Sequence, residues 1–149
     1  MKVVYNESEA VAEWVQKRIP WIPKSGFGKC QALGVADGNK PIAGVVYNEW
    51  VPEFKTIAVS MAASDPRWAS RSIIYELLSY PFDELDIWKV WGACPITNKR
   101  ALKFDEGMGF KREATLSDHF GRKNHAIVFR MKQPEFHERF SDLRERLAA

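Results

Sequence analysis

The chain has no long apolar stretch. None of the hydrophobic runs in its 149 residues approaches the roughly 20 residues that a helix needs to cross a bilayer. The first residues, Met1–Glu9, also lack the apolar centre of a secretory signal peptide. We therefore expect a cytoplasmic protein with no membrane partner.

Cysteine and histidine are scarce as well. Cys30 and Cys94 lie far apart, each inside an apolar run of strand length, and no pair has the spacing of a zinc site. We expect both to be reduced, buried thiols. His119 and His125 flank the last predicted turn, but no third ligand is placed beside them, so no metal is expected.

A concentrated basic stripe is also lacking. The formal charge of +3 suits any polyanionic ligand and selects none. Lys99, Arg100 and Lys103 form one basic helical face, which is either solvated or meets the phosphates of a cofactor or a nucleic acid. Nothing in the chain is typical of a base-reading motif, so a nucleic-acid partner is left open without support.

Apolar and aromatic residues are plentiful. Hydrophobic residues make up 46% of the chain and aromatic residues 13%, which is typical of a folded globular protein. The six tryptophans predict either a bulky aromatic core or an exposed surface for a partner. No repeat or linker interrupts the sequence. We expect one domain over residues 1–132, followed by a helical extension over residues 133–149.

The order of apolar patterns predicts an α/β fold. Asn6–Glu9 has the spacing of a capping box and precedes a helical apolar stripe, which predicts a helix over residues 7–19. Asp65 followed by Pro66 marks the start of a second helix, and Asn98 the start of a third. The predicted strands cover residues 30–36, 41–50, 56–63, 88–96, 111–116 and 126–131. This order gives a mixed, mostly antiparallel central sheet flanked by helices.

Residues 134–149 predict a C-terminal amphipathic helix. Phe136, Phe140, Leu143 and Leu147 share one stripe, and charged side chains cover the other faces. Two interpretations stay open. The helix docks on its own domain, or it contacts a second copy of the chain or another partner.

One segment, Asn98–Lys111, combines a helix, a glycine stop and the start of a strand. It resembles the fourth-helix motif of the GNAT acyltransferase superfamily, in which an Asn opens a helix that ends in Gly-Phe. The resemblance covers most of residues 1–132 and is closest to small GNAT-like proteins of phages and prophages. The segments that carry it are Ala43–Asn48, Asp65–Trp68, Tyr80–Leu85 and Asn98–Lys111.

This resemblance implies a binding site for acetyl-CoA or another acyl-CoA. The strand over residues 56–63 would separate from its neighbour, and backbone N–H groups near Ser60, Met61 and Ala62 would hold the acyl carbonyl and stabilise an oxyanion. Asn98 would hold the pantetheine arm. An ordinary buried strand explains the same residues equally well.

The implied phosphate loop departs from the family pattern, Gln/Arg-x-x-Gly-x-Gly/Ala. It corresponds to Arg67–Ser72, in which Ser70 and Ser72 replace the two small residues. A Cβ at each position crowds a bound phosphate, whereas Arg67 and Arg71 offset this with charge-assisted hydrogen bonds. The alternative is that CoA is not bound and both arginines lie on a solvated helix face.

Asp105 stands where the family has its general acid, a Tyr immediately before Glu-x-x-Gly-Phe. The reference pKa of Asp is about 4, against about 10 for Tyr, so Asp105 is a poor acid at neutral pH unless it is buried. We interpret it as a surface carboxylate or a group that binds a cationic substrate. Glu49 and Glu53 lie beside the implied acceptor cleft, as a general base or as exposed loop charges.

Three functions fit these observations. The first is an acyl-CoA-dependent N-acyltransferase of phage or prophage type, which transfers an acyl group directly to an amine of unknown identity. The second is a non-catalytic GNAT-fold binding or virion-associated protein, with residues 134–149 contacting a phage partner. The third is a phage DNA-modifying protein. The altered phosphate loop and the missing Tyr leave open whether the chain is an enzyme.

Overall fold

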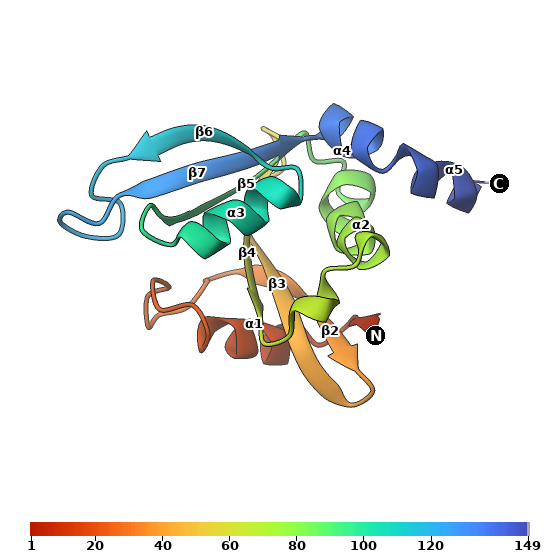
Figure 1. Cartoon of the computed structure of the whole chain (residues 1–149), viewed down its shortest axis with the longest axis horizontal. Helices are drawn as coiled ribbons and strands as arrows, with labels where there is room; N and C mark the ends of the chain where they lie inside the picture. Colours follow the sequence, from red (N-terminus) through yellow and green to blue (C-terminus); the bar gives the residue numbers. More distant parts are fainter. Residues whose placement is uncertain (149) are drawn as a thin grey trace.

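A twisted seven-stranded sheet in the order β1-β2-β3-β4-β5-β7-β6 organises the chain (Figure 1). The computed structural model describes residues 1–148, and side chains through residue 147. The strands are β1 (Lys2–Val4), β2 (Cys30–Asp37), β3 (Lys40–Val51), β4 (Thr56–Ala63), β5 (Lys89–Pro95), β6 (Lys111–Leu116) and β7 (Ala126–Lys132). The β4–β5 pair is parallel and the other pairs are antiparallel. The predicted mixed, mostly antiparallel sheet is therefore confirmed.

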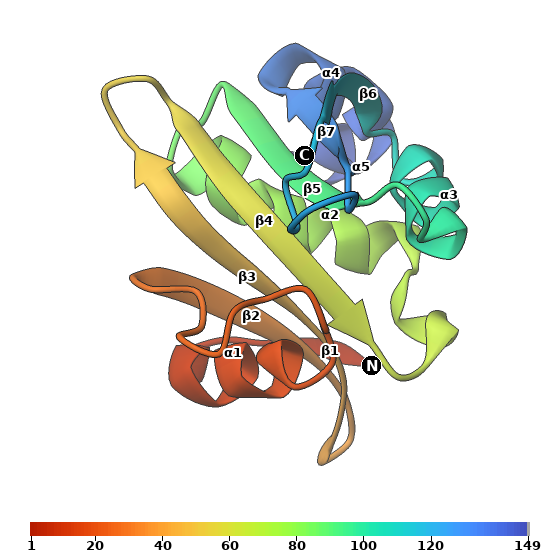
Figure 2. The ribbon, with the colours of Figure 1, turned by 90° about the vertical axis from the view of Figure 1, so that its left-hand side faces the viewer.

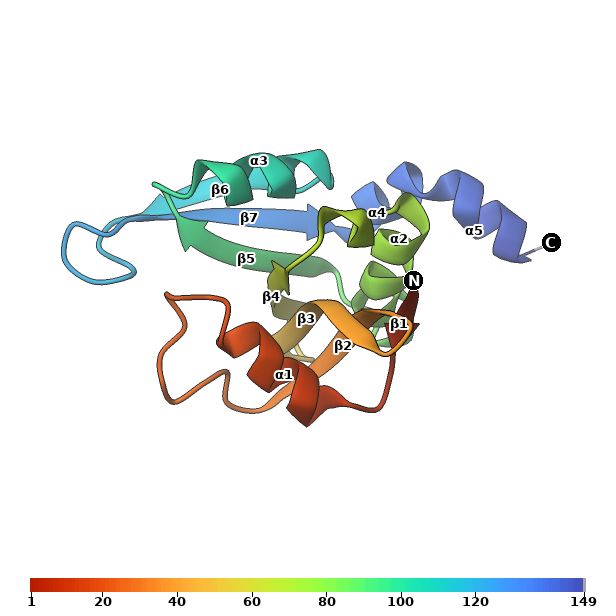
Figure 3. The same cartoon turned by 60° about the horizontal axis from the view of Figure 1, so that its bottom comes forward.

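Helices cover both faces of this sheet. They are α1 (Ser8–Gln16), the 3-10 turn η1 (Pro66–Trp68), α2 (Arg71–Ser79), the π-helical turn η2 (Tyr80–Glu84), α3 (Lys99–Gly107), α4 (Gln133–Arg139) and α5 (Ser141–Ala148). Figures 2 and 3 show α1 on one face of β2 and β3, with α2 on the opposite face. No helix in residues 1–148 has the length and apolar character needed to traverse a bilayer.

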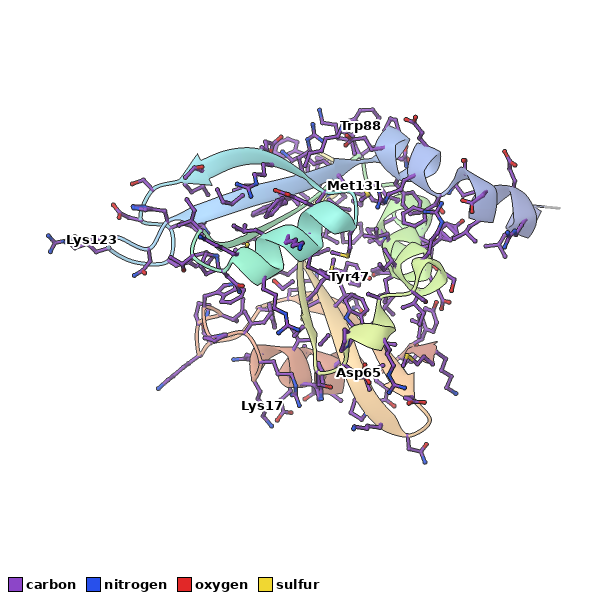
Figure 4. All side chains as sticks on the ribbon, in the orientation of Figure 1. Lys17, Tyr47, Asp65, Trp88, Lys123 and Met131 are labelled. Atoms are coloured by element: carbon purple, nitrogen blue, oxygen red, sulfur yellow. The ribbon has the colours of Figure 1, made fainter. Side chains whose placement is uncertain are left out.

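Successive side chains of β3 point to opposite faces of the sheet, so they contribute to two separate cores, each covered by a helix. Val46 packs with Val15 of α1, whereas Val45 and Tyr47 belong to the larger core that contains α2. The Tyr47 hydroxyl donates a hydrogen bond of 2.6 Å to the Leu77 carbonyl of α2, which satisfies the one polar atom of this buried side chain (Figure 4). The residue pattern thus fixes which helix lies on which face.

The start of α1 differs from the predicted capping box. Asn6 has a φ of 63°, and no side chain caps the helix at Glu7. Ser8 instead bonds to the sheet, where its hydroxyl accepts from the Ala32 N–H at 3.0 Å. The strand β1 was not predicted because its three residues, Lys2–Val4, are too few to show an alternating pattern.

The second helix begins in two steps rather than one. Asp65 caps η1 by accepting from the Arg67 N–H at 2.9 Å, and Ser70 then caps α2 by accepting from the Ile73 N–H at 3.3 Å. The helix-start signature at Asp65 is therefore correct for η1, and α2 proper starts at Arg71. At the other end Pro81, which has no N–H, lies where α2 passes into η2.

The C-terminal segment is two short helices that dock on α2 (Figure 1). Phe136 and Phe140 are 0% and 2% exposed, and both stack on Tyr75, with ring centroids 5.6 and 5.5 Å apart. These two side chains are covered by their own chain, so they are not free for a partner. Leu147 of the same predicted stripe stays 76% exposed. Residue 149 lies outside the described residues.

The cysteines and tryptophans divide between core and surface. Cys94 is buried and Cys30 is half-buried, and both are free thiols, so burial was predicted correctly for Cys94 only. Trp68 is 3% exposed, whereas Trp50 and Trp88 are about half exposed. The tryptophans therefore serve both of the roles considered from composition.

Candidate functional site

The parallel strands β4 and β5 separate partway along their length (Figure 2). Within the described chain they pair over Thr56–Ala58 and Lys89–Trp91 and no further, although β4 continues to Ala63 and β5 to Pro95. Beyond these residues, the backbone groups of one strand that face the other strand do not pair with it. The sheet therefore contains a split, as the resemblance implied for residues 56–63.

Gly92 marks the point where the split opens. A Cβ built on Gly92 would lie 2.9 Å from the Val59 carbonyl oxygen, closer than real Cβ contacts come. No side chain fits between the strands at this position. Glycine therefore keeps the backbones of β4 and β5 close where the pairing ends.

Two hollows meet at this split. The smaller, about 90 Å³, lies beside α3, and the larger, about 690 Å³, lies beside the α1–β2 loop. The residues that line both hollows belong to the two strands, except for one loop residue. They are Trp21, Val59, Ser60, Gly92 and Ala93. Groups held in the two hollows would thus approach each other at the split.

Helix α3 presents one face to the smaller hollow. Asn98 caps the helix by accepting from the Ala101 N–H at 3.1 Å. Ala101 and Asp105, one turn apart, both line the hollow. Gly109 follows the helix with a φ of 104°, and a Cβ there would lie 2.7 Å from Cδ of Arg139. The backbone conformation therefore favours the glycine stop of the motif, and a Cβ there would also displace the end of the Arg139 side chain.

Asp105 is the electrostatically unusual group of this hollow. Burial, and then the negative charge of Glu106, raise the pKa of its carboxyl to about 7. No side-chain hydrogen bond or ion pair within residues 1–147 offsets this cost at Asp105. The interpretation as a surface carboxylate is therefore wrong. The reason is tertiary: β5 and the residues before β2 close over the side chain.

Cys94 lies in the same hollow, and its thiol stays protonated at neutral pH. Burial, followed by the charge of Asp105, raises the pKa of its thiol to about 12. The thiolate, which is the nucleophilic form, is therefore nearly absent at neutral pH. A route through an acylated cysteine is not supported.

The side chains of the three β4 residues whose backbone N–H groups were predicted to hold the acyl carbonyl lie in two environments, and the role of those N–H groups stays a prediction. Ser60 and Met61 line the smaller hollow, and Ser60 also lines the larger one. Ala62 instead packs in the core beneath α1. The structure thus brings Ser60 and Met61 to the split, next to Asp105, and leaves Ala62 out.

Both arginines of the implied phosphate loop already have carboxylate partners. Arg67 binds Asp65 with guanidinium nitrogens at 2.6–3.1 Å and also approaches Asp37 at 3.6 Å (Asp65 is labelled in Figure 4). Arg71 donates to Asp142 of α5 at 2.6 Å and to the Arg139 carbonyl. Both side chains nevertheless remain exposed, Arg67 at 67% and Arg71 at 49%, so they lie on a solvated surface where carboxylates of the turn and of α5 share their charge. That either of them binds a phosphate stays a prediction.

The serines of this loop and the basic face of α3 form no ion pairs with the described residues and lie at the surface or in helix caps. The Ser70 hydroxyl is used as the α2 cap, and Ser72 is exposed, with its oxygen 3.5 Å from that of Ser70. Lys99, Arg100 and Lys103 are solvent-exposed. The side-chain oxygen of Asn98 is used in its own helix cap, which leaves its amide nitrogen for any contact with a substrate.

The predicted residue Glu49 lines the larger hollow and is solvent-exposed, like the loop charge considered from the sequence. It lies at a β3 bulge with a φ of 52°, in the left-handed region that non-glycine residues seldom occupy. Glu53 is exposed in the following turn and does not line the hollow. His119 also lines it, from the β6–β7 loop, whereas Lys123 projects from the tip of that loop into solvent (Figure 4).

Sequence reasoning missed the aromatic wall of this hollow. Trp21 and Phe27 come from the α1–β2 loop, Trp91 from β5 and Phe120 from the β6–β7 loop. The Trp21 and Phe120 rings pack across the opening with centroids 6.3 Å apart. The high aromatic content was the one available signal, and it did not say which rings converge.

Metal ligands do not converge anywhere in the described residues. No group of three or more His, Cys, Asp or Glu side chains within residues 1–147 has the geometry to hold an ion. The Nδ1 atom of His125 instead accepts from the Asp118 N–H at 3.0 Å, within the β6–β7 turn.

Solved structures of acetyltransferases share this architecture. The dodecameric spermidine N-acetyltransferase of Vibrio cholerae has a TM-score of 0.66 and 22% identity, over 75% of this chain and 70% of that chain. Mutant forms of the spermidine/spermine N-acetyltransferase SpeG from the same organism have a TM-score of 0.66 and 21% identity, over 74% and 70%. A T. thermophilus protein classed as an acetyltransferase has a TM-score of 0.66 and 20% identity, over 80% and 68%.

Sequence comparison adds no nearer relative to these structural matches. No protein-family model matches the sequence, and a search of curated protein sequences found no significant match. At 20–22% identity, the structural likeness speaks for the fold. The chain has the GNAT fold, as its resemblance to that superfamily predicted.

Proposed function

We propose that the protein is an N-acyltransferase that moves an acyl group from a thioester, acetyl-CoA or another acyl-CoA, directly to an amine. One observation carries this proposal: the Asp105 carboxyl, half-buried and without a bonded partner among the side chains of residues 1–147, lines the hollow where β4 and β5 separate. An unpaired carboxyl in such a place costs folding free energy and needs a functional reason. The GNAT fold of the acetyltransferase neighbours supports the same conclusion.

The split suits the acyl end of such a substrate. Backbone groups of β4 beyond Ala58 no longer pair with β5, so N–H groups near Ser60 are available to a carbonyl oxygen. Gly92 adds no side chain that would obstruct the approach. The larger hollow offers the amine a route to the same point, since Ser60 lines both.

The predicted binding site for the phosphates of CoA is less favourable. Arg67 and Arg71, which would offset the two serine substitutions, are already bound to Asp65 and Asp142. Phosphates would have to compete with these carboxylates for the guanidinium groups. We therefore assign most of the binding free energy of the thioester to its acyl and pantetheine end.

The proposed reaction is a one-step transfer in which a C–N bond forms as the C–S bond breaks. Asp105, protonated on about half of the molecules near pH 7, donates its proton to the departing sulfur. The Glu49 carboxylate, at the larger hollow, accepts the proton that the amine loses. Juxtaposition of the two substrates at the split supplies most of the rate, as it does for other bimolecular transfers.

Two measurements on the purified chain test this proposal. Thermal unfolding with millimolar acetyl-CoA should show a raised midpoint, because a ligand that binds only the native state stabilises it. Release of free CoA thiol should then depend on an added amine. If neither stabilisation nor thiol release occurs, the acyltransferase function is overturned.

A non-catalytic binding role, including that of a phage virion component, is the second candidate. The observation that favours it is the pairing of Arg67 and Arg71, which a CoA-independent protein would tolerate. Absence of CoA stabilisation combined with an intact fold would support this role. A DNA-modifying role has no comparable observation in its favour. It would require retention on duplex DNA that weakens steeply with salt.

A further inference from the structure

The larger hollow at the β4–β5 split has an unusual lining for an amine site. Its aromatic side chains come from three separate parts of the chain: Trp21 and Phe27, Trp91, and Phe120. Pro20 and Pro23 add further rigid apolar surface. The flat faces of such rings favour a ligand that is itself flat and apolar, or that carries a cation against a ring.

Charge in this hollow is limited to one carboxylate. Glu49 is the only acidic residue among its lining residues in the described chain, and no lysine or arginine lines it. His119 is the only other titratable side chain there. The hollow therefore favours a ligand with a single positive charge.

The β3 bulge sets the backbone conformation at Glu49, whose side chain is exposed at the hollow. The β3 bulge gives this residue a φ of 52°, a conformation that costs free energy for a residue with a Cβ. The neighbouring Asn48 side chain donates to the Phe27 carbonyl at 3.2 Å, which ties the aromatic loop to the same bulge. The carboxylate and the aromatic wall are thus parts of one built unit.

We propose that this hollow binds an acceptor amine with one positive charge and an aromatic body, an arylalkylamine, in preference to a polyamine. The ammonium group lies against Glu49, and the ring lies among Trp21, Trp91 and Phe120. A polyamine carries several charges along a flexible chain, and this hollow would leave all but one of them without a carboxylate. The inference rests on the acyltransferase function proposed above, whose acceptor it specifies.

Intrinsic tryptophan fluorescence tests the proposal without any thioester. 2-Phenylethylamine, which does not absorb where tryptophan is selectively excited, should change the emission of Trp21 and Trp91 in a saturable manner. Its affinity should exceed that of the uncharged 2-phenylethanol and that of spermidine by about fivefold, the size expected for one partly exposed ion pair. Tighter binding of spermidine would overturn the proposal.

Matched variants identify the carboxylate responsible. Glu49→Gln should reduce the affinity for 2-phenylethylamine to that for 2-phenylethanol, whereas Glu53→Gln, an exposed carboxylate outside the hollow, should leave it unchanged. Equal affinities of the parent and the Glu49→Gln protein would overturn the role of Glu49. The circular dichroism of each variant shows that it is folded.

A kinetic comparison separates this inference from the function on which it rests. Acetyl-CoA turnover with 2-phenylethylamine above that with spermidine supports both. Turnover with spermidine but neither binding nor turnover of 2-phenylethylamine overturns the acceptor class and keeps the acyltransferase. Saturable binding of 2-phenylethylamine with no turnover of any amine keeps the ligand class and overturns the acyltransferase.

Discussion

The charged side chains at the start of α2 are paired with opposite charges, whereas the carboxyl on the inward face of α3 is not, within the described residues. At α2, Arg67 and Arg71 are each held by carboxylates that lie beside them in the turn or in α5. At α3, Asp105 lines a hollow and has no bonded partner in the part of the chain that the structure describes, and burial raises its pKa to about 7. Paired surface charges are explained by the fold alone, whereas an unpaired, half-buried carboxyl is not.

This contrast distinguishes the proposed proton transfer at α3 from the binding of CoA phosphates at α2. In the proposed function, Asp105 on the α3 side is the group that transfers a proton near neutral pH. The α2 side has the arginines that a phosphate needs, but they are engaged by Asp65 and Asp142. We therefore expect a protein that catalyses acyl transfer but binds CoA with low affinity.

The largest effect is expected from removing the packing that holds α4 and α5 on α2. Phe136→Ala should lower the free energy of unfolding by about 3–5 kcal/mol, because Phe136 is 0% exposed and stacks on Phe82 at 4.8 Å. Chemical denaturation measures this loss. Leu147→Ala, at a 76% exposed position, is the matched control and should change stability little. A loss below about 1 kcal/mol for Phe136→Ala would show that the C-terminal helices are not part of the core.

The next effect concerns the chemistry at α3. Asp105→Asn keeps the shape of the side chain but cannot donate an acidic proton, so kcat/KM at pH 7 should fall about 100-fold. Steady-state release of CoA thiol measures the fall. Lys103→Gln, on the exposed face of the same helix, should leave the rate within about twofold of the parent. A similarly active Asp105→Asn protein would remove Asp105 from the mechanism.

The pH dependence of the rate is a second test of Asp105 as the proton donor. The reaction needs the protonated form of Asp105, so the rate should decrease as pH rises through about 7. Glu106→Gln removes the nearby like charge, which lowers the pKa of Asp105 and should move this falling limb to lower pH. An unchanged limb in the Glu106→Gln protein would mean that another group titrates there.

Stability should follow the same titration. The pKa of Asp105 is raised above its value in the unfolded chain, so the folded protein binds more protons between about pH 4 and 7. The contribution of Asp105 to stability is fully present below about pH 4 and is lost as pH rises through about 7. Denaturation across this range should show that the parent loses stability relative to Asp105→Asn. Parallel curves for the two proteins would contradict the raised pKa.

The smallest effect concerns the phosphate end. Asp142→Asn frees Arg71 from its exposed ion pair and should tighten acetyl-CoA binding by about threefold. Asp83→Asn, which breaks the Arg144 pair of the same helix without touching Arg71, is the control and should leave the affinity unchanged. Titration calorimetry measures both. Equal affinity of the parent and Asp142→Asn would show that Arg71 is not a phosphate ligand.

Local patterns predicted most of the fold and little of the site. Apolar runs of strand length over residues 41–50 and 56–63 predicted β3 and β4, since helices bury both faces of β3, and Asn98 with Gly109 marked α3 through its cap and its stop. The burial of Asp105, the Arg71–Asp142 pair and the Trp21–Phe120 contact join residues far apart in sequence. No spacing rule contains such contacts, and they decide what the site can do.

Direct titration of the Asp105 carboxyl is the sharpest test of this account. The side-chain carboxyl carbon, observed by NMR with selective ¹³C labelling and assigned with the Asp105→Asn protein, reports its protonation state without any substrate. We expect a midpoint near pH 7, so that the group is an acid under physiological conditions. A midpoint near 4, the reference value for Asp, would contradict it, because the carboxyl would then be ionised at neutral pH and have no proton to donate.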